Sequence, residues 1–218
     1  MEAPASRFHA QRLERCGEAL ERNHFRVSIV SDPEEAHRIV MDRVAAEIRP
    51  RSVSWGDSMT LHACGILESI ARIDHIRLIR TFEPGVPRPE IIERRRQALL
   101  VDLFLTGTNA VTETGQLVNL DMVGNRVAGL TFGPRQVVVV AGRNKIVPDL
   151  AAARERIRTR AAPLNAMRHE GFRTPCRKTG TCMDCNSPDR ICNTWAITEK
   201  SFPKGRIHVV LIHQDLGL

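Results

Sequence analysis

Apolar and polar positions along the chain follow two alternating patterns. Short β-branched or apolar runs predict strands. Between them, apolar residues recur every three or four positions, as in amphipathic helices. The predicted strands span residues 26–31, 52–55, 76–80, 101–107, 116–121, 136–142 and 206–214. The predicted helices span residues 6–23, 33–48, 59–70, 88–99 and 149–161.

The order of these elements predicts the fold class. Strands and helices alternate from residue 26 to residue 100, a pattern that builds parallel strands with right-handed crossovers. The runs at 101–107 and 136–142 are apolar throughout and so predict strands buried on both faces, whereas 116–121 alternates and predicts an antiparallel neighbour. We predict one α/β domain over residues 1–218, with a Rossmann-like, mostly parallel sheet and helices on both faces.

The loops that follow the predicted strands are the candidate binding site, because open parallel sheets bind ligands at the carboxyl ends of their strands. Hydroxyls of Ser58 and Thr60, at the start of a helix, are suited to an anion. Asp57 would repel a phosphate, so a role as the cap of that helix is favoured over ligand binding for this residue. Asparagines in such loops also serve as turn residues. The ligand-binding candidates are Gly56, Asp57, Ser58, Thr60, Thr106, Gly107, Asn109, Asn144 and Lys145.

Glu113 is the candidate catalytic residue. It lies among small polar residues in the segment Thr112–Gly115, after a buried strand. A carboxylate there can act as an acid, a base or a nucleophile, and the glycine lets a substrate approach the backbone closely. The alternative is an ion pair with an arginine such as Arg135 or Arg126, since structural ion pairs are common where arginine is abundant.

Four of the six cysteines crowd into a loop predicted at residues 172–195, with the spacing C-x5-C-x2-C-x6-C. Four thiolates so close in sequence can converge on one zinc ion or iron–sulfur cluster, and thiol redox chemistry is a further possibility. Zinc sites usually carry two C-x2-C pairs, and this loop has one; the spacing also matches neither common ferredoxin run. The candidate metal ligands are Cys176, Cys182, Cys185 and Cys192.

The composition of the chain indicates its cellular compartment and the classes of partner that it can bind. The formal charge is +7 and the pI about 9.6, with nearly all of the basic excess from arginine. No basic stripe with interleaved aromatic residues is present, so we expect no nucleic-acid partner. No secretory signal and no run of 18 apolar residues is visible, so we expect a cytoplasmic protein without a membrane span. Structural disulfides are uncommon in that compartment.

Three segments resemble the LUD (lactate-utilisation) domain family: SWGDSMTLHACGILESI, TGTNAVTETGQLVNLD and VAGLTFGPRQVVVVAGRNKIV. The resemblance covers about residues 25–150, and the cysteine tail looks like that of short family members. It implies a fold similar to the sugar-phosphate isomerase and CoA-transferase group. Within that group, Gly56–Thr60 is similar to the isomerase phosphate loop and Thr112–Gly115 to the turn that carries the transferase nucleophile.

The resemblance also implies a function, since family members are associated with bacterial oxidation of L-lactate to pyruvate alongside iron–sulfur proteins. We therefore expect an accessory or electron-transfer component in oxidation of L-lactate or a related small 2-hydroxy acid. Its partners would be a small anionic metabolite and iron–sulfur redox proteins. The cysteine centre would be an iron–sulfur cluster, with zinc as the alternative. The competing hypotheses are a transferase or isomerase that uses Glu113, and a non-catalytic binding protein with structural zinc.

One further expectation concerns the position of the cysteine loop. A short connection joins the loop after residues 136–142 to the helix at 149–161 and then to the cysteine loop. Consecutive elements with short connections lie close together. We therefore expect the cysteine loop to cap the strand-end pocket, with Arg173, Arg177 or Lys178 at its rim.

Overall fold

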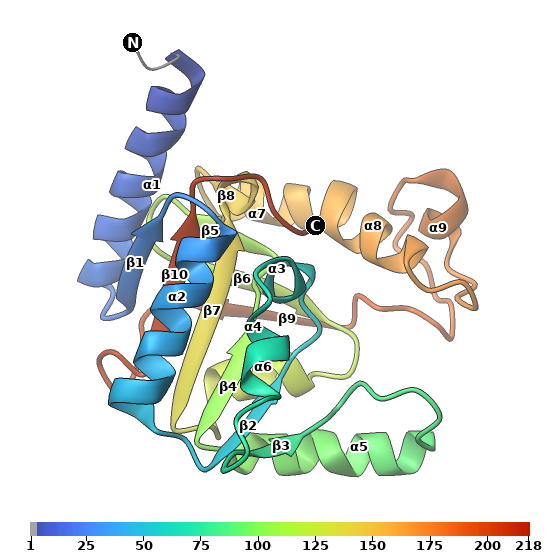
Figure 1. The fold of residues 1–218 in the computed structure, drawn as a ribbon. Helices are drawn as coiled ribbons and strands as arrows, with labels where there is room; N and C mark the ends of the chain where they lie inside the picture. Colours follow the sequence, from blue (N-terminus) through green and yellow to red (C-terminus); the bar gives the residue numbers. More distant parts are fainter. Residues whose placement is uncertain (1–3) are drawn as a thin grey trace.

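The computed structural model describes residues 4–218 and is built on a six-stranded sheet, in which every pairing is parallel. The first three residues of the predicted domain lie outside the described part. Figure 1 shows the strands side by side with their carboxyl ends at one edge. Their order across the sheet is β1 (Arg26–Val30), β10 (Ile207–Ile212), β7 (Gln136–Gly142), β4 (Leu103–Thr106), β2 (Ser52–Trp55) and β3 (Arg77–Ile79).

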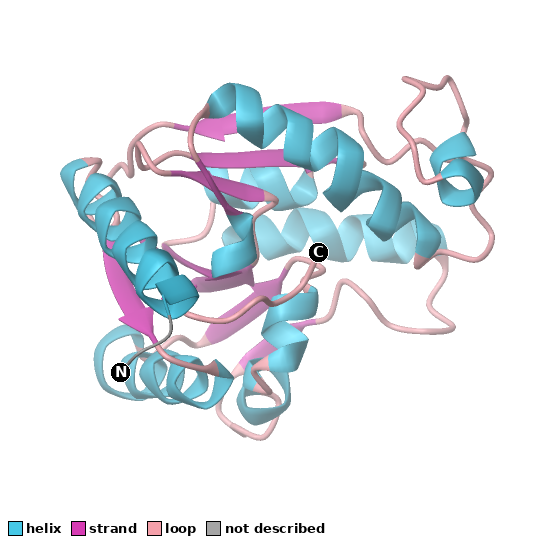
Figure 2. Cartoon of the chain, turned by 90° about the horizontal axis from the view of Figure 1, so that it is seen from above, coloured by secondary structure: helices cyan, strands magenta, loops and turns pink. Residues whose placement is uncertain are grey.

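Helices cover both faces of this sheet, as the sequence predicts (Figure 2). Alternate side chains of one strand enter opposite cores: Phe104 faces one, whereas Leu103 and Leu105 face the other. The Phe104 side is covered by α1 (Pro4–Arg22) and α6 (Asn125–Thr131). The other side is covered by α2 (Pro33–Arg43), α3 (Met59–Ala63) and α4 (Ile66–Ile70). The apolar runs of β4 and β7 are buried because both of their faces are covered.

The predicted helix 59–70 is interrupted at one residue. Gly65 has φ +63 and separates α3 from α4. A left-handed residue ends an α-helix, and glycine adopts that conformation without steric cost. Helix α2 instead continues into a π-helical turn, Val44–Ile48, so the predicted span 33–48 is helical throughout.

A second sheet of four strands packs beside the first, with the order β8 (Ile146–Val147), β5 (Ala110–Thr112), β6 (Leu117–Asp121) and β9 (Thr194–Thr198). Strand β6 is antiparallel to both β5 and β9, which confirms the neighbour predicted from its alternating pattern. Helix α7 (Leu150–Arg156) covers this sheet through Ala153, and Ile157 of the following π-helical turn Ile157–Ala161 joins the same core.

Several short elements were not predicted from periodicity. They are α6, β5, β8, β9, α8 (Ala162–Met167) and α9 (Pro175–Thr179). Each has seven residues or fewer, and so few positions do not define a helical or extended period. Helix α5 (Arg88–Gln97) and the 3-10 turns Ala98–Leu100 and Arg143–Lys145 complete the regular structure.

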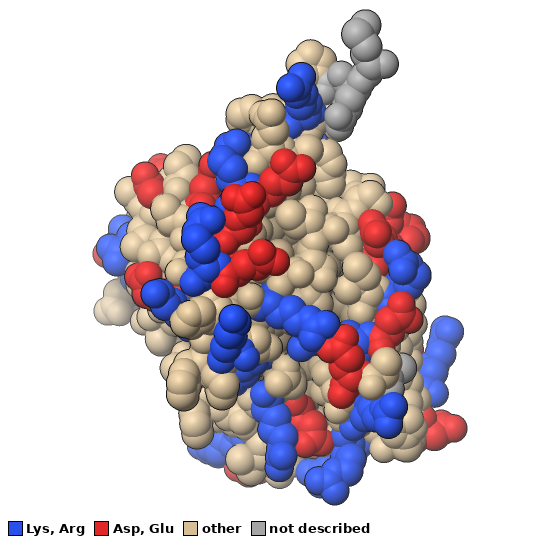
Figure 3. All heavy atoms as spheres, turned by 90° about the vertical axis from the view of Figure 1, so that its left-hand side faces the viewer, with Lys and Arg blue, Asp and Glu red and all other residues tan. Residues whose placement is uncertain are grey.

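Charged side chains of both signs are interspersed on the face that carries α1 and β1 (Figure 3). Arg26–Glu47 and Arg38–Glu35 are examples of ion pairs between arginines and glutamates. Among residues 4–218, no helix combines the length and apolar character that a bilayer crossing requires.

Candidate functional site

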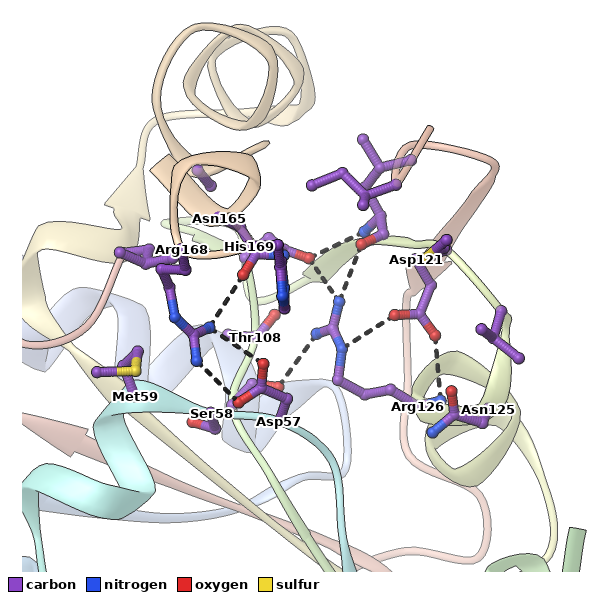
Figure 4. A pocket seen from close by; sticks show the side chains of 18 of the residues that line it. Asp57, Ser58, Met59, Thr108, Asp121, Asn125, Arg126, Asn165, Arg168 and His169 are labelled. Carbon is purple, nitrogen blue, oxygen red and sulfur yellow. Dashed lines mark hydrogen bonds and ion pairs between the residues drawn. The ribbon is translucent and has the colours of Figure 1, made fainter. Parts of the chain in front are cut away.

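The loops after β2, β4 and β7 meet at a pocket of about 280 Å³ at the carboxyl edge of the main sheet. Asp57–Met59, Gly107–Asn109 and Lys145 come from these three loops, so the predicted meeting of the loops is confirmed. The opposite wall comes from the end of β6, the start of α6, and helix α8 with the residues that follow it (Figure 4). Because neighbouring parallel strands end at one edge, their loops necessarily lie side by side.

Five of the predicted ligand-binding residues line this pocket: Asp57, Ser58, Gly107, Asn109 and Lys145. The other four lie around it. A Cβ built on Gly56 would come within 3.0 Å of both Arg126 Cγ and Thr106 Oγ1, so this glycine is in close contact with the wall. Thr60 contacts Lys145, and Asn144 Oδ1 accepts a hydrogen bond from the backbone N–H of Leu216 at 3.1 Å. Ligand binding by this set remains a prediction.

Ser58, rather than Asp57, caps helix α3. Ser58 Oγ accepts a hydrogen bond from the Leu61 N–H at 3.3 Å. Asp57 instead accepts hydrogen bonds from Arg168, at 3.0 and 3.2 Å, and Figure 4 shows the two side chains facing each other across the pocket. The capping role considered for Asp57 is therefore wrong, because Arg168, directly after α8, lies within reach of its carboxylate.

Arg126 organises the wall formed by β6 and α6. Its guanidinium donates to Asp121 Oδ1, Asn119 Oδ1 and Asn109 Oδ1, at 3.3, 2.6 and 2.8 Å. It also donates to the Leu120 carbonyl oxygen at 3.0 Å. These contacts fix Asn109 and Asn119 as structural partners of an arginine.

Lys145 lies buried in the pocket wall without a carboxylate partner. Its Nζ donates a hydrogen bond to Thr60 Oγ1 at 3.0 Å, and no Asp or Glu of residues 4–218 lies within ion-pair distance of it. Burial first, and then the positive charges of Arg156 and Arg126, together lower the pKa of Lys145 to about 7. Near neutral pH this amine is therefore close to the midpoint of its titration.

Arg95, from helix α5, is a second pocket cation without an ion pair in the described part of the chain. Its guanidinium carbon lies 5.2 Å from the centre of the Phe82 ring, and its Nε has no hydrogen-bond partner. Burial lowers its pKa, while Asp121 and Asp57 act in the opposite direction. The side chain thus lies near both pocket carboxylates without a direct hydrogen bond to either.

Five charged or titratable residues of the pocket lining were not among the sequence candidates: Arg95, Asp121, Arg126, Arg168 and His169. Arg95 belongs to the run ERRRQ, but its pattern does not show which arginine faces inward. His169 stacks on Phe172 with ring centres 4.5 Å apart. Arg168 and His169 follow α8, which periodicity did not detect.

Glu113 does not line the pocket. Its carboxylate accepts hydrogen bonds from Arg12 Nε at 2.8 Å and Arg15 Nη2 at 3.2 Å, both from helix α1. Burial alone would raise the pKa of Glu113, but the hydrogen bonds and charges of these two arginines outweigh it and lower the pKa. An arginine pair was the alternative considered for this residue, with Arg12 and Arg15 in place of the expected Arg135 or Arg126. The structure offers no support for catalysis by Glu113.

The four clustered cysteines lie in one loop, with free thiols. Within residues 4–218, no three His, Cys, Asp or Glu side chains form a group that could hold a metal ion. The thiols are nevertheless close enough to interact: burial raises the pKa of Cys192 most, Arg190 opposes this, and the other three cysteines of the loop raise the pKa further. Their donor type suits zinc or iron–sulfur, but the side chains as arranged do not converge. Ligation by the four remains a prediction.

Cys16 and Cys64 lie apart from this loop, in the apolar helical surroundings that the sequence predicts. Burial raises the pKa of Cys16 to about 12 and that of Cys64 to about 11. Both therefore behave as apolar core residues.

The cysteine loop and the pocket share a wall. A small apolar core joins Cys176 and Cys192 to Met122, Phe172 and Ile191. Those last three residues also line the pocket. The expected approach of the loop to the pocket is thus confirmed for its two ends. The expected rim residues Arg173, Arg177 and Lys178 do not line the pocket; Arg173 pairs with Asp189 inside the loop at 3.0 Å.

Comparisons with known proteins are consistent with this fold. The structure is similar to the crystal structure of a DUF162 family protein from Deinococcus radiodurans, with a TM-score of 0.53 and 16% sequence identity. The match covers 94% of this chain and 98% of that one, and at this identity it supports the fold alone. Comparison with curated proteins gives no match. The LUD domain model matches residues 13–212, a range that includes the cysteine loop and all of the pocket lining except Leu218. The chain therefore belongs to the LUD domain family.

Proposed function

We propose that this protein binds a small carboxylate, L-lactate or a related 2-hydroxy acid, in the strand-end pocket. In this proposal it serves the oxidation of that acid as an accessory or electron-transfer component. The observation that carries the proposal is the charge of the side chains that line the pocket, of which four are cationic and two are carboxylates. Arg126 and Arg168 are paired with Asp121 and Asp57, so Arg95 and Lys145 are left without a counter-charge among the described residues.

The size and polarity of the pocket favour a small ligand. Its volume of about 280 Å³ lies just below the range of about 300–1,000 Å³ that is usual for drug-sized ligands. Buried cations are costly unless an anion pairs with them, so a carboxylate that enters next to Arg95 and Lys145 is favoured. Asn165 and His169, on the α8 side, offer polar groups for a neighbouring hydroxyl.

The proposed redox role depends on the cysteine loop. If the four thiolates of Cys176, Cys182, Cys185 and Cys192 hold an iron–sulfur cluster, that cluster would supply one-electron transfer. Arg190 donates hydrogen bonds to the carbonyl oxygens of Cys185 and Cys192 and so stabilises the second half of this loop. The shared apolar wall would keep the loop beside the ligand pocket. We expect a cytoplasmic location, where thiols remain reduced and able to bind metal.

The carboxylate-binding proposal is tested by titration of the protein with L-lactate and with lactamide, its neutral analogue, followed by calorimetry. We expect binding of lactate only. Because Arg95 supplies an unpaired charge near the pocket carboxylates, Arg95→Met should weaken lactate binding about tenfold or more. Glu113→Gln is the control and should leave binding unchanged, since Glu113 lies outside the pocket. Equal binding of lactate and lactamide, or no effect of Arg95→Met, would contradict the proposal.

The cofactor is tested by metal analysis of protein purified without oxygen. We expect iron and sulfide, and a brown colour that lactate bleaches when a redox partner is present. Replacement by serine of any one of Cys176, Cys182, Cys185 and Cys192 should lower the metal content, whereas Cys16→Ser and Cys64→Ser should not. One zinc without iron would favour the structural-zinc alternative, and full metal content in all four single variants would exclude the ligand assignment.

A further inference from the structure

The chain contains four lysines, and Lys145 is the buried one. The other three, Lys178, Lys200 and Lys204, are exposed. All other Lys and Arg positions of the chain are arginines. Arginine stays charged in proteins, whereas a buried lysine can lose its proton near neutral pH. The pocket thus contains one lysine, whose charge can change, beside three arginines, whose charge is constant.

Within residues 4–218, no Asp or Glu side chain forms an ion pair with the Lys145 amine. Thr60, from α3, accepts its hydrogen bond, and a Cβ built on Gly217 would lie 3.0 Å from Nζ. From α7, Arg156 faces it as a positive charge and is itself bound to the carbonyl oxygens of Asn144, Asn109 and Leu218. The remaining titratable and charged groups of the pocket are Asp57, Arg95, Asp121, Arg126, Arg168 and His169.

The two pocket carboxylates do not compensate for this lack. Asp57 is paired with Arg168 and Asp121 with Arg126, at 3.0 and 3.3 Å. Charges that act directly on Lys145 are those of Arg156 and Arg126, and both disfavour its ammonium form. An anion that entered beside Nζ would reverse this balance, because an adjacent opposite charge stabilises the protonated amine.

We infer that Lys145 takes up a proton as a carboxylate enters the strand-end pocket, so that the site binds the anion and a proton together. This inference rests on the proposed function in one respect: the ligand is a carboxylate. The balance is simple, since one neutral amine, one proton from water and one carboxylate give one ammonium–carboxylate pair. No bond of the ligand breaks in this step.

The sign of the pH dependence follows. In the free protein the pKa of Lys145 is about 7. Below that pH the amine is already charged, so ligand binding takes up little additional proton. Above it, the free amine is neutral and the bound amine is charged, so each ligand brings one proton. Affinity then falls about tenfold for each pH unit above 7, up to the pKa of the bound state.

The test is calorimetric titration with L-lactate at pH 8, in Tris and in Hepes, whose ionisation enthalpies differ. We expect uptake close to one proton per lactate in the wild-type protein and none in Lys145→Met, whose weaker binding should not vary with pH between 7 and 9. Lys204→Met, the same change at an exposed lysine, should retain full proton uptake.

A second measurement does not require a variant. Protein labelled with ¹³C at lysine Cε should give four signals, one of which titrates near pH 7 and moves to a higher pKa with L-lactate. Lactate binding without proton uptake, or without a shift of that signal, would overturn this inference and leave the proposed function standing. Absence of lactate binding to the wild-type protein would overturn both.

Discussion

Gly115→Ala should lower the free energy of unfolding by about 2–5 kcal/mol, the largest effect that we expect from a single added methyl group. Gly115 has φ +84 in the turn between β5 and β6. A Cβ there would meet the backbone of helix α1, at 2.5 Å from the Ala19 carbonyl carbon and 2.7 Å from the Leu20 nitrogen. Backbone atoms of a packed helix cannot move aside as a flexible side chain can, so the added carbon must displace α1 from the sheet.

The matched control is Gly85→Ala. Gly85 has φ +81, and a Cβ built on it meets no atom within 4 Å. This variant has the same left-handed backbone without the close contact, so it should cost only about 1–2 kcal/mol. The measurement is urea unfolding followed by circular dichroism. Equal losses in the two variants would show that α1 does not pack against the β5–β6 turn as the structure places it.

Lys145→Met should stabilise the protein at pH 6 by as much as about 4 kcal/mol, and the gain should shrink as the pH rises toward 9. The pKa of Lys145 is about 7 in the folded protein against an ordinary value of 10.5. Below pH 7 both states are protonated, so folding bears the full cost of an unpaired buried ammonium. Between pH 7 and 10.5 the unfolded state binds the additional proton, so the stability of the wild-type protein rises with pH.

Urea unfolding of both proteins from pH 6 to pH 9 checks this expectation. Lys204→Met serves as the control, because an exposed lysine should contribute no such pH-dependent difference. If Lys145→Met is less stable than the wild-type protein at pH 6, then Lys145 has a counter-charge that the structure does not contain. The same result would remove the basis for proton-coupled binding.

Much of the main sheet follows from its apolar runs. Strand β7 begins and ends where the sequence predicts, because a strand buried on both faces is almost wholly apolar and its flanking residues are not. The bounds of β2 also match the prediction, which ended that strand at Gly56. The single helix predicted at 59–70 was wrong, since one left-handed residue, Gly65, is enough to divide it. Strand β9 was missed because a five-residue edge strand, TWAIT, has partly buried residues on both faces and no clear alternation.

The candidate site was predictable to the extent that topology determines it. Strand ends of a parallel sheet must meet, which placed Asp57, Gly107 and Lys145 in one pocket. The opposite wall depends on how α5 and α8 pack over that edge. The spacing of residues around Arg95 and Arg168 does not indicate how these helices pack. For Glu113 the surroundings of small polar residues indicated an accessible carboxylate, whereas the partner that binds it, Arg12, is distant in the sequence.

The position of β10 has a consequence for how the protein is made. This strand, from the last part of the sequence, lies between β1 and β7, and β1 has no other strand neighbour among the described residues. At about 5–20 residues per second, β1 must wait on the order of ten seconds or more after its synthesis before its partner leaves the ribosome. Until then the edges of β1 and β7 that pair with β10 remain open, and the pocket lacks Leu218, which forms part of its wall. The growing chain is therefore most open to aggregation, and most dependent on chaperones, just before translation reaches residues 207–212.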